Sequence, residues 1–226
     1  MAQSYYTRQL LSERQLREIS ELLPNATWSK SKEDLIEYYP KYQSSSEMVK
    51  SEVRNRIAEL VMNQVNADIR FYDRVFPRQS TAVIISKTSE GEGLKIHHDN
   101  AKVGEFSTTV FLSDPETYEG GELCLWYEGQ EQKFKLPAGH AITYSTGAPH
   151  MVAPVTSGSR IVAVFWTTSS IRDPRHREVL SGMRQIRRLL PEIISYDFDE
   201  VVEDPAFQLL EIENKFIRYF VNPAGM

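Results

Sequence analysis

The feature that most constrains the fold is a run of short β-prone segments between residues 81 and 168. Turns rich in Gly, Pro, Asp and Ser separate them, and short strands at such spacing are typical of an antiparallel sandwich or barrel. The sequence therefore predicts a mainly β core of the jelly-roll type, the double-stranded β-helix of cupin-like proteins. The expected strands span residues 81–87, 94–99, 105–113, 121–127, 131–136, 140–145, 150–156 and 160–168.

Amphipathic helices are expected on both sides of this core, so the fold class is α+β. A capping-box pattern begins the first helix, over 12–23, and apolar residues at helical spacing predict a second over 46–66. Downstream, Asp-Pro pairs typical of helix starts predict a helix over 174–190 and another from residue 205. In the 174–190 helix, the residues expected to face inward are Val179, Met183 and Ile186.

The length of 226 residues and a hydrophobic content of 41% suit a single domain over 1–226 with a sizeable core. Within it we expect helical support and a flap in 1–80, the jelly-roll core in 81–168, and C-terminal helices in 169–226. The candidate flap is the aromatic-rich stretch from Trp28 to Tyr42. Packing of these aromatic side chains against the first two helices is the alternative.

Composition restricts the partners and the compartment. A net charge of −5 argues against a nucleic-acid partner, because phosphates favour a basic surface. The single cysteine, Cys124, excludes an internal disulfide, fits a reducing compartment and is expected to be a buried, unreactive thiol. No segment is long and apolar enough to span a membrane, and the N-terminus has no apolar signal core. We therefore expect a soluble, cytoplasmic protein.

His97 and Asp99 are two residues apart, so on an extended strand their side chains point the same way, and His98 points the opposite way. His150 is the candidate second imidazole. Two imidazoles and one carboxylate leave coordination positions open for O2 and a co-substrate, as a non-haem Fe(II) oxygenase requires. A His-x-Asp pair alone is more often part of a surface strand, so this interpretation depends on the downstream residues.

Arg160 follows His150 by ten residues, with Ser157-Gly158-Ser159 between them. We interpret this triplet as a hairpin turn, which puts His150 and Arg160 on neighbouring antiparallel strands. A three-residue loop places both on one side of the sheet, whereas a two-residue loop turns Arg160 away. A guanidinium binds a carboxylate bidentately, so Arg160 is a candidate anchor for the far end of 2-oxoglutarate. Taken alone, it is more simply a solvated arginine at a strand end.

The chain resembles the Fe(II)/2-oxoglutarate-dependent dioxygenases of the prolyl 4-hydroxylase type, and within them the bacterial PKHD-type hydroxylases. The resemblance is densest between residues 80 and 177. It is carried, in order and spacing, by His97-x-Asp99, Phe111-Leu112-Ser113-Asp114-Pro115, Tyr118-Glu119-Gly120-Gly121-Glu122-Leu123, Leu136-Pro137-Ala138-Gly139, Tyr144, His150-Met151-Val152-Ala153-Pro154-Val155 and Arg160.

This resemblance implies that His97, Asp99 and His150 ligate Fe(II) and that Arg160 binds the distal carboxylate of 2-oxoglutarate, making these four the candidate catalytic residues. It implies an enzyme that hydroxylates an unactivated C–H bond with O2 and releases succinate and CO2. Ascorbate is a candidate reductant. The substrate is expected to be a prolyl or other residue of a peptide or protein, with a small molecule as the alternative.

Two positions depart from the family pattern. Thr88 stands where a tyrosine is expected to contact the co-substrate, so Thr88 and Tyr144 are both retained as candidate cofactor contacts. His140 replaces the aspartate of the usual Pro-Ala-Gly-Asp, which keeps open a site built on a different imidazole. The roles of His98 and His140 stay open.

Two rival functions share parts of the pattern. A nucleic-acid dealkylase has the same triad, but enzymes of that kind carry a second arginine six residues after the co-substrate arginine, where this chain has Trp166. A cupin-like metal- or ligand-binding module without turnover is the other.

The mixed charge of the last helix favours packing on the domain or on a second copy over membrane binding, so a homodimer is also considered.

Overall fold

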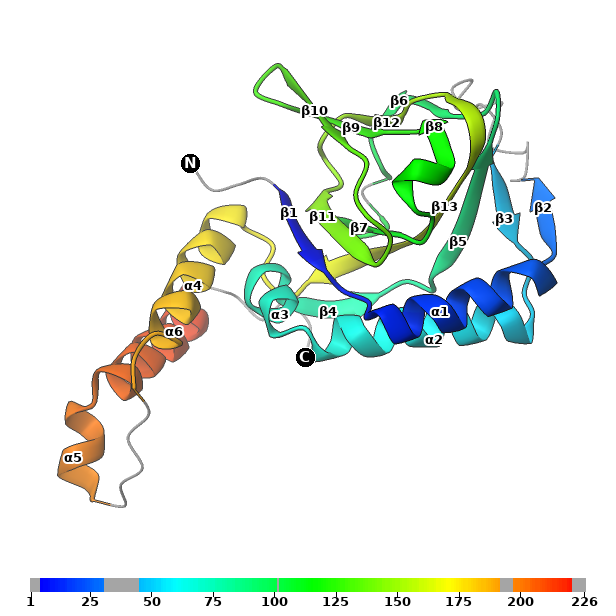
Figure 1. Cartoon of the computed structure of the whole chain (residues 1–226). Helices are drawn as coiled ribbons and strands as arrows, with labels where there is room; N and C mark the ends of the chain where they lie inside the picture. The colour runs from blue at the N-terminus through cyan, green and yellow to red at the C-terminus, as the bar shows by residue number, and fades with distance from the viewer. Residues whose placement is uncertain (1–4, 31–44, 101, 192–196, 221–226) are drawn as a thin grey trace. The chain divides into compact units, whose positions relative to one another are not determined.

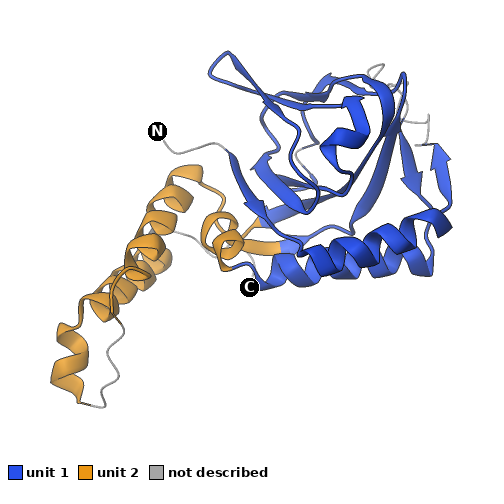
Figure 2. Ribbon diagram, viewed as in Figure 1, with its two compact units in different colours: residues 1, 3–68, 79–168 blue, residues 2, 69–78, 169–226 orange. Residues whose placement is uncertain are grey.

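The computed structural model describes residues 5–30, 45–100, 102–191 and 197–220, which divide into two compact units (Figure 2). Unit 1 contains the described residues of 3–68 and 79–168, and unit 2 contains those of 69–78 and 169–226. The segment expected to form the jelly-roll core lies wholly within unit 1. The assignment of the whole chain to a single domain stays a prediction.

Unit 1 consists of two antiparallel sheets and two helices, α1 (Glu13–Leu22) and α2 (Glu52–Ala67), which lie side by side (Figure 1). The larger sheet has the order β1-β11-β7-β13-β5-β3-β2 and the smaller one β10-β9-β12-β6, while β8 pairs with the start of β13. The strands of the larger sheet are β1 (Tyr5–Gln9), β2 (Trp28–Lys30), β3 (Ser46–Met48), β5 (Ile84–Ser89), β7 (Phe106–Phe111), β11 (His140–Ser145) and β13 (Val155–Ser169). The remaining strands are β6 (Leu94–His97), β8 (Tyr118–Gly120), β9 (Leu123–Tyr127), β10 (Gln130–Phe134) and β12 (His150–Val152).

The core of unit 1 draws on both sheets, which confirms the predicted jelly-roll core. Alternate residues of each strand point inward, because successive side chains of a strand lie on opposite faces. Burying each large apolar side chain contributes roughly 1.5–3 kcal/mol. The buried cluster comprises Phe111, Leu123, Leu125, Phe134, Ile142, Tyr144 and Val162.

The first helix begins as predicted, and the second begins later than predicted. At the start of α1, the Gln15 amide donates to Ser12 Oγ (3.4 Å) and the Ser12 amide donates to Gln15 Oε1 (2.9 Å), which completes the capping box. The helix expected from residue 46 is wrong over its first turn, because Ser46–Met48 form β3 between β2 and β5. Ser51 then caps α2 by accepting from the Arg54 amide (3.2 Å).

Strand β1 was not expected from the sequence, which has no clear apolar alternation there. All five of its residues pair with β11. The buried Arg8 side chain fixes it further, through an ion pair with Asp68 and a hydrogen bond from Nη1 to Thr143 Oγ1 (3.1 Å). Of the candidate flap, Trp28–Lys30 form β2, paired with β3, and residues 31–44 lie outside the described part of the chain.

Unit 2 is helical, and its core is small. Its elements include α3 (Ile69–Val75), α4 (Pro174–Arg187), α5 (Phe198–Glu203) and α6 (Pro205–Phe220). Strand β4 (Pro77–Ser80) follows α3, and its residues are divided between the two units. Asp173 caps α4 by accepting from the Arg175 amide (2.8 Å), as the Asp-Pro pair predicts. One buried apolar cluster of unit 2 comprises Phe76, Ile171 and Leu180, against which Met183, Phe216 and Ile217 pack.

The predicted inward face of α4 is partly wrong, and the helix ends at Arg187 instead of residue 190. Val179 and Ile186 are 43% and 56% exposed, whereas Leu180 is fully buried and Met183 packs on the core. Val179 and Leu180 are adjacent and both apolar, so periodicity alone could not decide which of them faces inward. No helix in the described ranges is long and apolar enough to cross a membrane.

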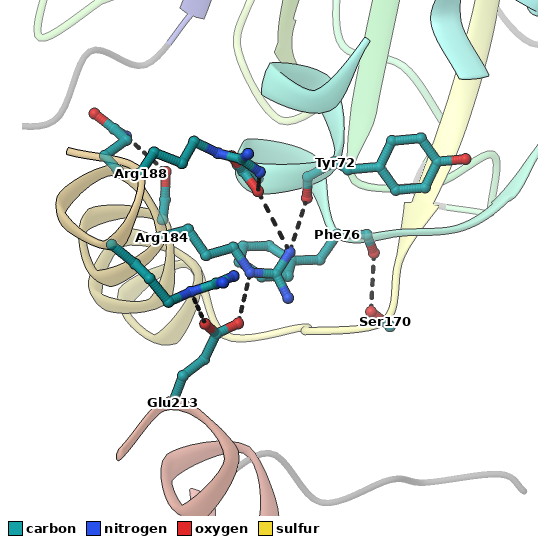
Figure 3. Close-up of polar contacts among 10 residues, drawn as sticks. Tyr72, Phe76, Ser170, Arg184, Arg188 and Glu213 are labelled. Carbon is teal, nitrogen blue, oxygen red and sulfur yellow. Dashed lines mark hydrogen bonds and ion pairs between the residues drawn. The ribbon is translucent and has the colours of Figure 1, made fainter. Parts of the chain in front are cut away.

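Three helices of unit 2 are joined by a polar cluster (Figure 3). Arg188, just after α4, donates from Nε and Nη2 to the two oxygens of the buried Asp73 in α3 (2.6 and 3.0 Å). Arg184 of α4 donates from Nε to Glu213 of α6 (2.6 Å). The other Glu213 oxygen, Oε2, is 3.8 Å from Arg187 Nε. These charge-assisted contacts provide cationic partners for two buried carboxylates and hold α3 and α6 to α4.

Candidate active site

The structure brings His97, Asp99 and His150 together inside unit 1. One potential ligand atom from each lies within 4.8 Å of the others. Asp99 Oδ1 is 3.7 Å from His150 Nε2 and 4.0 Å from His97 Nε2. The two histidines are direct partners in the β12–β6 pairing, with ring centroids 4.3 Å apart. Cross-strand pairing therefore supplies the two imidazoles, and the segment directly after β6 supplies the carboxylate.

Backbone carbonyls fix the orientation of both imidazoles. His97 Nδ1 is 2.8 Å from the Lys95 oxygen, and His150 Nδ1 is 2.9 Å from the Ala148 oxygen. A carbonyl only accepts, so each Nδ1 carries the proton and each Nε2 offers a lone pair. Burial lowers the pKa of His150, with Asp99 opposing the shift, and this favours the neutral ring that binds metal.

The two oxygens of Asp99 have different partners. Trp166 Nε1 donates to Asp99 Oδ2 (2.9 Å), which leaves Oδ1 directed toward the imidazoles. In the sequence, Trp166 stands out only as a difference from the nucleic-acid dealkylases, and its contact with Asp99 was not predicted. The even spacing between Arg160 and Trp166 on one strand was the available signal, because it places both side chains on the same face.

This donor set fits Fe(II). Two neutral imidazoles and one carboxylate oxygen, directed to a common point, are the ligands of the facial triad of non-haem iron enzymes. Among the residues that the structure describes, no other group of three His, Cys, Asp or Glu side chains comes together in this way.

The other two candidate imidazoles lie outside the cluster. His98 is exposed, with Nδ1 3.0 Å from the Gly147 oxygen. His140 begins β11, where it pairs with Gln9 of β1. The geometry therefore does not favour the alternative of a site built on a different imidazole.

Arg160 lies in the interior, but the strand arrangement that places it there differs from the predicted hairpin. The predicted hairpin is wrong, because Ser157, Gly158 and Ser159 lie within the continuous strand β13. Gly158 has a φ of +77°, and the register of β13 against β8 shifts between Val155 and Ser157. The glycine therefore lies next to an irregularity within a continuous strand and not in a hairpin turn. His150 belongs to the smaller sheet and Arg160 to the larger, so the two approach from opposing sheets.

Arg160 is a buried cation that lacks a full set of partners. The residue is 3% exposed, and its Nε has no hydrogen-bond partner among the described residues. Its guanidinium carbon is 5.4 Å from the centroid of the Phe111 ring, and the phenols of Tyr118 and Tyr144 are near enough to interact with its charge. Burial lowers the pKa of Arg160, but an arginine stays charged at neutral pH. A buried guanidinium is costly unless it is paired, so an anion bound beside Arg160 would stabilise it.

The two other candidate contacts line the same interior. Thr88 is 1% exposed and lies directly opposite Arg160 in the β5–β13 pairing. Tyr144 is buried, with its ring edge-on to His150 at a centroid distance of 5.2 Å. Burial, with a contribution from Asp99, raises the pKa of Tyr144, so its phenol stays protonated and can donate a hydrogen bond.

Residues 81–168 match the family model of the 2OG-Fe(II) oxygenase superfamily. A PKHD-type hydroxylase of Thermosynechococcus vestitus is 33% identical over 192 residues, covering 81% of this chain and 86% of that protein. The chain belongs to the PKHD-type hydroxylases of the 2OG-Fe(II) oxygenase superfamily. The resemblance drawn from the motifs is thus confirmed, and the family places the chain among the oxidoreductases.

A second relative and two solved structures are also similar to this chain. A PKHD-type hydroxylase of Maricaulis maris is 36% identical over 142 residues, a match that spans 61% of this chain and 63% of that protein. A Pseudomonas putida prolyl-4-hydroxylase structure has a TM-score of 0.53 and 13% identity, covering 74% of this chain and 94% of that one. HygX from Streptomyces hygroscopicus, solved with nickel, 2-oxoglutarate and hygromycin B bound, has a TM-score of 0.54 and 12% identity, covering 74% and 83%. At these identities the two structures show the shared fold alone.

Proposed function

We propose that this protein is an Fe(II)- and 2-oxoglutarate-dependent hydroxylase in which His97, Asp99 and His150 hold the iron. The observation that supports this most is the convergence of the three ligand atoms in the fold of a 2OG-Fe(II) oxygenase. The buried Arg160, with its unpartnered Nε, adds a site for a carboxylate. When bound, Fe(II) supplies the activation of O2: one oxygen atom enters succinate, the other enters the alcohol product, and the 2-oxo acid loses CO2.

The protein's own groups bind, orient and shield the reactants. The carbonyl oxygens of Lys95 and Ala148 hold the ligand rings in one tautomer. Arg160 binds the distal carboxylate with its planar fork, and Thr88 and Tyr144 line the space beside it. The apolar inner faces of the two sheets exclude water from this space.

For the substrate we propose a prolyl or other residue of a peptide or protein. In support, one structure of this fold is a prolyl hydroxylase from Trichoplax adhaerens in complex with a peptide fragment, at a TM-score of 0.56 and 13% identity. A small molecule is the alternative, because HygX is solved with hygromycin B. Ascorbate as reductant, a homodimer, a cytoplasmic location and the absence of a nucleic-acid partner remain predictions.

A substrate panel tests this proposal. Proline-containing peptides, lysine peptides and free amino acids are each incubated with Fe(II), 2-oxoglutarate and O2, and succinate is measured beside the mass of each candidate. We expect succinate together with a gain of one oxygen atom on a peptide. Oxygen gained only by a free small molecule would overturn the peptide substrate and leave the iron chemistry intact. A complete lack of iron-dependent succinate would instead favour the binding module without turnover.

A further inference from the structure

The hydroxyl of Tyr118 is buried and unused. Tyr118 is 3% exposed, and its oxygen has no hydrogen-bond partner among the described residues. Burial raises the pKa of Tyr118, an effect that the charge of Arg160 opposes, so the phenol is protonated and close enough to Arg160 to sense its charge. A buried hydroxyl without a partner is destabilising, and such groups are usually satisfied by a ligand or by water.

Strand pairing places Tyr118 beside Arg160. Tyr118 is the direct partner of Gly158 in the β8–β13 ladder. Arg160 follows Gly158 by two residues, which puts it on the same face and at the diagonal position from Tyr118. Diagonal neighbours in an antiparallel pair lie within reach of long and aromatic side chains.

Two glycines with positive φ allow the side chains to approach. A Cβ atom on Gly121 would lie 3.1 Å from Tyr118 Cε2 and 3.2 Å from Arg160 Cδ, so the phenol ring and the arginine stem flank one point of the backbone. A Cβ atom on Gly158 would lie 3.0 Å from Tyr118 Cα. Lys135 also contacts Tyr118: its Nζ lies 4.4 Å from the centroid of the Tyr118 ring and donates to the Tyr118 backbone carbonyl (2.7 Å). The ring is therefore held in place beside the guanidinium.

We propose that the Tyr118 hydroxyl and the Arg160 guanidinium together bind the distal carboxylate of a five-carbon 2-oxo diacid. A carboxylate has about four lone-pair sites, enough to accept from both the guanidinium and a phenol. The proposal rests on the function proposed above. It also supplies a phenol for the co-substrate site, in which residue 88 is a threonine.

The test compares Tyr118→Phe with the wild type by calorimetric titration in the presence of Mn(II), without turnover. Two ligands are titrated: 2-oxoglutarate, and 2-oxopentanoate, which has the same five carbons and a methyl group in place of the distal carboxylate. The variant keeps the ring and its packing. We expect its Kd for 2-oxoglutarate to rise about tenfold, as for a lost hydrogen bond to a charged group, and its Kd for 2-oxopentanoate to stay unchanged.

Two further variants serve as the positive and the negative control of the titration. Arg160→Lys should weaken 2-oxoglutarate selectively, as Tyr118→Phe does. Tyr127→Phe removes the hydroxyl of another partly buried tyrosine, on β9, and should change neither Kd.

An unchanged 2-oxoglutarate Kd in Tyr118→Phe, or an equal loss for both ligands, would overturn the role of Tyr118 while the proposed function stands. A wild-type protein that binds neither acid with Mn(II) would instead overturn both proposals.

Discussion

Asp99 is the proposed iron ligand whose position depends most clearly on a single neighbour. Its Oδ2 is held by Trp166 Nε1 at 2.9 Å, and this bond restricts rotation of the carboxylate. In Trp166→Phe the carboxylate loses that restraint, so we expect Mn(II) to bind about tenfold more weakly, in the range measured for partners of metal ligands. Titration with Mn(II) measures the effect.

Trp28→Phe is the matched control, because Trp28 lies in β2, with Lys87 Nζ 5.6 Å from its ring, and should leave the affinity unchanged. Equal Mn(II) affinities of Trp166→Phe and the wild type would contradict the positioning role of Trp166.

Alanine substitution separates the proposed ligands from the other imidazoles. We expect His97→Ala and His150→Ala each to lose tight Mn(II) binding, because each removes one of three donors to the common point. His98→Ala and His140→Ala should bind Mn(II) as the wild type does, since neither ring belongs to the cluster. A large loss in His140→Ala with none in His150→Ala would show that the ligand set is wrong.

For single residues, spacing in the sequence predicted on which side of a strand a side chain lies, but it did not predict that side chain's contacts with distant strands. The two-residue spacing of His97 and Asp99 was enough to place both on one side, and the resemblance added His150. Trp166 was missed because its partner, Asp99, follows a strand of the other sheet, and spacing along β13 indicates only the face on which Trp166 lies. Tyr118 was missed because its place beside Arg160 depends on the pairing of β8 with β13. The Ser-Gly-Ser triplet was misinterpreted as a turn because a glycine with positive φ can also lie within an irregular strand.

Among the elements, the polar cluster of unit 2 is open to a direct test. Glu213 is buried, with 4% of its side chain exposed, and accepts from Arg184 Nε at 2.6 Å. Glu213→Ala leaves a largely buried guanidinium without this partner, so we expect the free energy of unfolding to fall by about 1–3 kcal/mol. Urea denaturation measures the change.

Glu211→Ala on the same helix is the control. Its i,i+4 pair with Lys215 (2.7 Å) is more than half exposed, so its removal should cost at most about 0.5 kcal/mol. Equal effects of the two substitutions would contradict a special role for the buried cluster.

Element boundaries were predictable where a local signal decides them. The Ser12 and Asp173 caps are local hydrogen bonds, and both helices begin as predicted. Strand β1 was missed because its position depends on β11, more than 130 residues further along the chain, and on the burial of Arg8. The start of α2 was misplaced because residues 46–48 pair with distant strands, and such tertiary contacts override local propensity.

For the molecule as a whole, the accessibility of the Cys124 thiol to a labelling reagent measures unfolding of the jelly roll. Its side chain is fully buried, and burial raises its pKa to about 11. The pKa of an unfolded thiol is about 8.5. Between these two pKa values the thiol is ionised in the unfolded state and protonated in the folded state, so the free energy of unfolding falls as the pH rises. At pH 8 we expect a thiol-specific reagent to label native protein far more slowly than urea-unfolded protein. Rapid stoichiometric labelling without urea would contradict the burial of Cys124.

We propose that the cluster of two imidazoles and a carboxylate supports oxygenase chemistry with a 2-oxo acid. The most direct test incubates the Fe(II)-loaded protein with 2-oxoglutarate under ¹⁸O2 and measures the mass of the succinate formed, with Asp99→Ala as the comparison. We predict succinate that carries one ¹⁸O atom in the wild type and no succinate above background in the variant. Unlabelled succinate, or equal amounts from both proteins, would show that this cluster does not carry out the proposed oxygenase reaction.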